Sequence, residues 1–95
     1  MKDKIAQILV KELNYSDHVA ALTAGDLVAV QPQLQPALKT WLDTRSITNA
    51  EVGQFSIKLF MEQRGYTFPS ALISLDWLLT EPEIAKQELT NEVRR

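Results

Sequence analysis

Few side chains of this sequence could do acid–base chemistry, and Asp76 is the first to consider. It stands among leucines and beside Trp77 in the stretch PSALISLDWLL. A carboxyl group in apolar surroundings can act as a general acid, but it needs a second polar group nearby, and the sequence points to none. Because buried acids are normally paired, we expect Asp76 to be structural: paired with a Lys or Arg, bonded to Thr80, or solvated.

The tripeptide Ser16-Asp17-His18 contains the three residue types of a hydrolase triad. A triad, however, brings together residues that are distant in sequence, with the serine and the acid on opposite imidazole nitrogens. Ser16 is better explained as the N-cap of a helix. His18 is the only histidine and the chain has no cysteine, so one chain cannot build a multi-histidine or thiolate metal site.

Other cofactor signals are equally weak. Gly25, Gly53 and Gly65 are isolated, whereas phosphate-binding loops cluster their glycines. Glu88 and Glu92 share a helix face, which is typical of surface charge rather than of metal ligation. We therefore expect no catalytic site, no metal or other cofactor, and no small-molecule ligand.

The composition is that of one folded domain spanning residues 1–95, with the last few residues frayed. Hydrophobic residues make up 45% and charged residues 23%, enough for one modest core. No stretch approaches the roughly 18 apolar residues of a membrane span, and the absence of cysteine fits the cytoplasm. The net charge of −2 and the scattered Lys and Arg argue against a nucleic-acid partner.

Apolar residues recur at helical spacing, and glycine and proline fall where helices end. No segment has the pattern of a β-hairpin. It stays open whether residues 16–30 form one kinked helix or two, with Thr23 as a second N-cap. The predicted fold is all-α, a single compact bundle of five or six short helices with short loops. The expected helical segments are 3–13, 16–30, 36–44, 48–64 (or a start nearer 56), 67–79 and 80–93.

Cap signals set several of these boundaries. Thr48–Glu51 and Thr80–Glu83 both match the S/T-x-x-E capping box. Gly65 is expected in the left-handed conformation at a helix C-terminus. Thr67 is expected to cap the next helix, with Pro69 in its first turn.

The helix over residues 67–79 is expected at the centre of the fold. Ile73 and Trp77 form a second apolar arc on the far side of its main leucine-rich arc. A helix that is apolar on two faces is either buried or covered by a partner. Ile73 and Trp77 are therefore the predicted partner surface, although the sequence leaves open whether Trp77 belongs to the core or to an interface.

These observations favour a small non-catalytic helical protein-interaction or regulatory module, which binds a protein partner or a second copy of itself. The alternative is a compact DNA-binding regulator of helix-turn-helix type. It would consist of the helix ending at Arg64, the turn GYTFP and the helix from about Ser70. The start of that second helix offers no Arg, Lys, Asn or Gln to read bases, which is why we treat it as the alternative.

Overall fold

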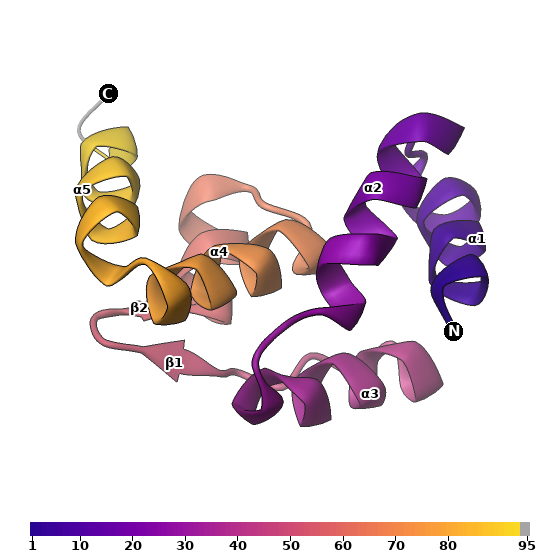
Figure 1. Ribbon diagram of the computed structural model, residues 1–95, viewed down its shortest axis with the longest axis horizontal. Coiled ribbons are helices and arrows are strands. Elements are labelled where there is room, and N and C mark those ends of the chain that lie inside the picture. The colour runs from indigo at the N-terminus through magenta and orange to yellow at the C-terminus, as the bar shows by residue number, and fades with distance from the viewer. Residues whose placement is uncertain (94–95) are drawn as a thin grey trace.

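The first two helices pack side by side as an antiparallel pair in the computed structural model, which describes residues 1–93 (Figure 1). The expected fraying of the last residues lies largely outside this range. The all-α prediction is confirmed: helices dominate residues 1–93, and the one sheet in this range has two very short strands. The elements in order are α1 (Lys2–Leu13), α2 (Asp17–Val28), η1 (Pro32–Leu34), α3 (Gln35–Thr44), β1 (Glu51–Val52), β2 (Phe55–Ser56), η2 (Leu59–Gln63), α4 (Phe68–Thr80) and α5 (Pro82–Val93).

The turn between α1 and α2 is built from two local devices. Asn14 ends α1 in the left-handed conformation with φ 61°, which asparagine tolerates better than most residues. Ser16 then caps α2, because its Oγ accepts the backbone N–H of Val19 at 3.2 Å. The cap prediction for Ser16 is confirmed, and residues 16–30 contain one helix rather than two.

Thr23 does not start a new helix, because it lies in the interior of α2, where its backbone takes part in the hydrogen bonding of that helix. In addition, Ala20, Ala24 and Leu27 bury one continuous face of α2 against the core. The chain then turns at Gln31 into η1, and Pro36 sits in the first turn of α3, as predicted. Arg45 ends α3 with φ 61°.

The predicted capping box at Thr48–Glu51 is wrong. Glu51 and Val52 are instead extended and pair antiparallel with Phe55 and Ser56, in a hairpin that the sequence did not predict. Gly53 has φ 61° in its tight turn, a conformation that a glycine adopts without strain. The hairpin buries Phe55, and this tertiary contact outweighs the local capping signal.

The helical segment after the hairpin begins near Ser56, which was the other predicted start. Ser56 Oγ accepts the backbone N–H of Leu59 at 3.1 Å, and Asn49 Oδ1 accepts that of Lys58 at 3.0 Å. The segment continues as the π-helical η2. Gly65 follows with φ 70°, so its predicted left-handed conformation is confirmed.

Helix α4 lies in the middle of the molecule, between α2 and α5 (Figure 1). Thr67 caps it as predicted, accepting the backbone N–H of Ser70 at 3.4 Å, and Pro69 stands in its first turn. The Thr67 hydroxyl also lies 2.8 Å from that of Tyr15, which fixes the start of α4 to the α1–α2 turn. The rings of Phe68 and Trp41 stack with centroids 5.0 Å apart and join α4 to α3.

The predicted capping box at Thr80–Glu83 is also wrong. Thr80 is the last residue of α4, and its hydroxyl donates back to the Trp77 carbonyl at 3.3 Å. Pro82 begins α5 as expected, with Ala85 and Leu89 against the core. Over residues 1–93, no helix is both long and apolar enough to cross a membrane.

Candidate partner-binding surfaces

The predicted partner surface, Ile73 and Trp77, is half-buried. Both side chains pack against the main core cluster from the second face of α4. This chain therefore covers part of Trp77 itself, and half-burial favours a structural contribution for both residues. Their role as a partner surface stays a prediction.

Within residues 1–93, Asp76 bonds to a backbone amide, not to Thr80 or to a Lys or Arg, and this bond is exposed to water. Its Oδ1 accepts the backbone N–H of Gln31 at 2.8 Å, where Gln31 is the residue that precedes η1. The bond joins α4 to the connection between α2 and α3. The Thr80 hydroxyl, a predicted partner, bonds to the Trp77 carbonyl instead. Asp76 is thus a connector between elements.

Ser16 and His18 do not form a catalytic arrangement. Ser16 Oγ is engaged as the cap of α2, and His18 lies exposed on its first turn. Among residues 1–93, no group of three or more His, Cys, Asp or Glu side chains could hold a metal ion.

Most side chains at the start of α4 are buried in the core. Phe68, Pro69, Ala71 and Leu72 are buried in the core, and Ser70 alone of the first five residues is exposed. A recognition helix must present its N-terminal side chains to base edges. The helix-turn-helix alternative stays a prediction.

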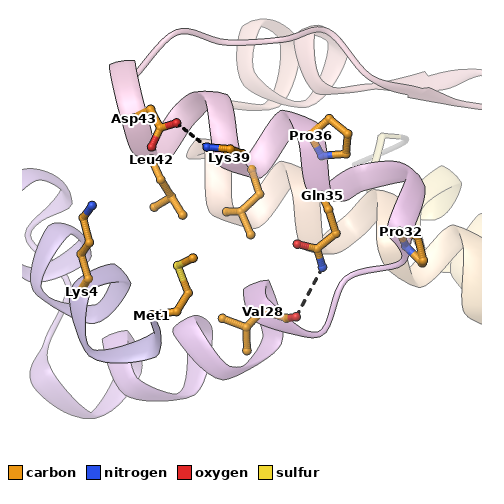
Figure 2. A pocket seen from close by; sticks show the side chains of 10 residues that line it. Met1, Lys4, Val28, Pro32, Gln35, Pro36, Lys39, Leu42 and Asp43 are labelled. Atoms are coloured by element: carbon orange, nitrogen blue, oxygen red, sulfur yellow. Dashed lines mark hydrogen bonds and ion pairs between the residues drawn. The ribbon is translucent and has the colours of Figure 1, made fainter.

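An apolar groove that the sequence did not indicate lies between α3 and the facing ends of α1 and α2 (Figure 2). Its volume is about 570 Å³. Leu42 points from α3 toward Met1 and Val28 on the opposite wall, as Figure 2 shows. Met1 and Val28 are 81% and 36% exposed, so apolar surface at the mouth of the groove is left in water. The lining residues are Met1, Lys4, Val28, Pro32, Gln35, Pro36, Leu38, Lys39, Leu42 and Asp43.

A side-chain amide braces one wall of the groove. Gln35 Nε2 donates to the Val30 carbonyl at 2.8 Å and lies 3.4 Å from the Val28 carbonyl, so it ties the end of α2 to the start of α3. Pro32 and Pro36 restrict the backbone along the same wall. A groove with fixed walls binds a ligand at a lower entropic cost than one that must first form.

The charged rim of the groove carries two lysines and one aspartate. Lys39 Nζ lies 3.0 Å from Asp43 Oδ2, an exposed pair one helical turn apart. The hydrogen bond from Lys39 and then its charge lower the pKa of Asp43, with a smaller effect of the Lys4 charge in the same direction. Lys4 forms no ion pair with any residue in the described range. The rim is therefore net positive, with Lys4 as its unpaired cation.

A second apolar surface lies on the outer face of α2. Val19 and Leu22 are 47% and 60% exposed, and Asp26 continues their stripe at helical spacing. Gly25 lies beside this stripe, and an added Cβ there would meet nothing within 4 Å. We call Val19, Leu22 and Asp26 the α2 stripe. Helix α2 contains two aspartates but no Lys or Arg, so the charge of this surface is opposite to that of the groove rim.

No family model matches the chain, and no curated protein or solved structure matches it significantly. The α2 stripe had a readable signal in the sequence: as a single helix, DHVAALTAGDLV has apolar residues on every side instead of on one face, which predicts either burial or a partner. The groove had none, because its walls come from three separate elements.

Proposed function

We propose that this chain is a small, non-catalytic helical interaction module, and that it binds a helix of a protein partner in the groove between α1, α2 and α3. The observation that carries the proposal is an apolar groove of about 570 Å³ whose exposed walls include Met1 and Val28. Grooves of this kind hold the apolar face of an amphipathic helix, as a recurring mode of peptide recognition.

The charge of the rim supports a specific chemistry for that helix. Because Lys4 and Lys39 outnumber Asp43, a helix with apolar residues on one face and an acid beside them fits the groove better than a basic one. The absence of cysteine supports the cytoplasm as the location of this module.

A displayed library of short helical peptides tests the proposal. Selection on the whole protein should enrich peptides with apolar residues at i, i+3 or i+4, and i+7, together with Asp or Glu. Their binding should fall for Val28→Glu, which places a carboxylate at the mouth of the groove.

The matched control is Ile84→Glu, the same type of substitution at a 55% exposed apolar residue on α5. Peptides that bind wild type, Val28→Glu and Ile84→Glu equally would show that the groove is not the binding site. A selection dominated by basic peptides would contradict the proposed charge preference.

A further inference from the structure

We infer that the helix bound in the groove is α2 of a second copy of this chain, so that the protein associates with itself head to tail. The inference rests on the proposed function and names its partner. The contact places Val19 and Leu22 of one copy in the groove of the next.

The first argument is that both halves of such a contact are present on one monomer and each leaves apolar side chains exposed, although the groove leucines Leu38 and Leu42 are themselves buried. The groove leaves Met1 and Val28 in water, and the α2 stripe leaves Leu22 60% exposed. Burial of these side chains against each other is a favourable driving force for association. An apolar surface complementary to a groove elsewhere on the molecule produces a head-to-tail contact.

The second argument is charge complementarity. The α2 stripe ends in Asp26, and the groove rim holds Lys4, which has no ion pair within residues 1–93. Lys39 is already engaged by Asp43 at 3.0 Å, whereas Lys4 lies beyond ion-pair distance of every acid within residues 1–93 and can receive the incoming carboxylate. A symmetric α2-to-α2 contact is less favourable, because that helix carries two aspartates and no Lys or Arg to neutralise them.

The geometry of α2 allows one copy to use both surfaces at once. Val19 and Val28 are nine residues apart, which at about 100° per residue places them on opposite sides of the helix. A copy can therefore hold a neighbour in its groove while its own stripe lies in the groove of another.

Sedimentation equilibrium of the whole protein tests the inference. The weight-average mass of the wild type should rise with concentration. Leu22→Glu places a carboxylate in the α2 stripe, and Val28→Glu places one at the mouth of the groove. Each should weaken association about tenfold or more, as loss of a central contact does. Ile84→Glu should associate like the wild type.

Mixing the two defective variants gives the decisive measurement. An equimolar mixture of Leu22→Glu and Val28→Glu should form a heterodimer, because the first keeps its groove and the second keeps its stripe. In a symmetric dimer, both substitutions would damage the same interface, and mixing the two variants would not restore association. A mixture that stays monomeric while the wild type associates would overturn the inference.

Charge reversal at two exposed positions gives an independent test. Lys4→Glu and Asp26→Lys should each weaken association, and their mixture should restore it by pairing the new glutamate with the new lysine. Unchanged association in both single variants would overturn the inference even if Val28→Glu were poorly folded.

Failure of the inference is distinguishable from failure of the proposed function. A wild type that remains monomeric at submillimolar concentration overturns self-association. If displayed acidic helical peptides still bind that monomer and lose affinity for Val28→Glu, the groove remains a docking site for a different protein.

Discussion

Asp76 accepts the backbone N–H of Gln31 at 2.8 Å across 45 residues of sequence, and so joins the central helix to the connection between α2 and α3. Gln31 precedes η1, whose Pro32 belongs to the groove wall. The bond therefore holds the wall of the groove that contains Pro32 against the central helix α4.

We expect Asp76→Ala to lower the free energy of unfolding by about 1 kcal/mol, because the bond involves a charged acceptor but is exposed to water. Asp76→Asn keeps an acceptor oxygen and should cost less. Urea denaturation measures both. Glu88→Gln, on the exposed side of α5, is the control and should change stability by less than about 0.5 kcal/mol. Equal effects of all three substitutions would contradict the connecting role of Asp76.

The start of α4 was predictable because its signals are local. Gly65, Thr67 and Pro69 lie within five residues of one another and each has one strongly preferred position at a helix end. The box at Thr48–Glu51 failed because the chain beyond it forms the hairpin, and Asn49 caps a different segment through Lys58.

The groove could not be predicted from the sequence, because its walls come from separate elements of the chain. Met1, Val28 and Leu42 come from three helices, and their proximity depends on how those helices cross. The α2 stripe was hidden only by the open question over residues 16–30: two short helices have no common face, whereas one helix has an exposed apolar face.

The Glu12–Arg45 ion pair should make stability depend on pH. Arg45 Nε and Nη2 lie 2.8 and 2.6 Å from the two Glu12 carboxylate oxygens. The hydrogen bonds from Arg45, and then its charge, hold the pKa of Glu12 below its ordinary value of 4.5. A carboxyl whose pKa is lower in the folded state stabilises the fold above its unfolded pKa, and this contribution is lost as pH falls through the folded pKa.

Glu12→Gln should therefore unfold at a lower urea concentration than the wild type at neutral pH, and the difference should shrink as pH falls below 4.5. Added salt should also reduce it, because the pair is exposed. Asp43→Asn is a parallel case: Lys39 lowers the pKa of Asp43 from 3.8, so the loss begins at a lower pH. A difference that grows on acidification would contradict the stated role of the ion pair.

Substitution of Trp77 distinguishes a structural role of the Ile73 and Trp77 arc from a role in partner binding. Because its side chain is half-buried against the core, we expect Trp77→Ala to lower the free energy of unfolding by about 2 kcal/mol, below the ~3–5 kcal/mol typical of a fully buried tryptophan. Ile73→Ala should cost about 1 kcal/mol by the same reasoning. Self-association and peptide binding should survive at temperatures where the variants are folded.

Calorimetry combined with sedimentation checks this expectation. If Trp77→Ala were as stable as the wild type but monomeric, the arc of Ile73 and Trp77 would be the partner surface, as its sequence pattern first predicted.

Gly65 and Gly25 differ in backbone conformation, so alanine at the two positions should change stability in opposite directions. Gly65 has φ 70°, and an added Cβ would meet nothing within 4 Å, so the cost of Gly65→Ala is that of the left-handed backbone alone, roughly 1–2 kcal/mol. Gly25 lies inside α2 without a positive φ and is equally open, so Gly25→Ala should stabilise the protein by about 0.5–1 kcal/mol. Urea denaturation of the two variants under identical conditions measures both signs. Destabilisation by Gly25→Ala would show that α2 is not a regular helix at this point, and would remove the single helical face on which the α2 stripe depends.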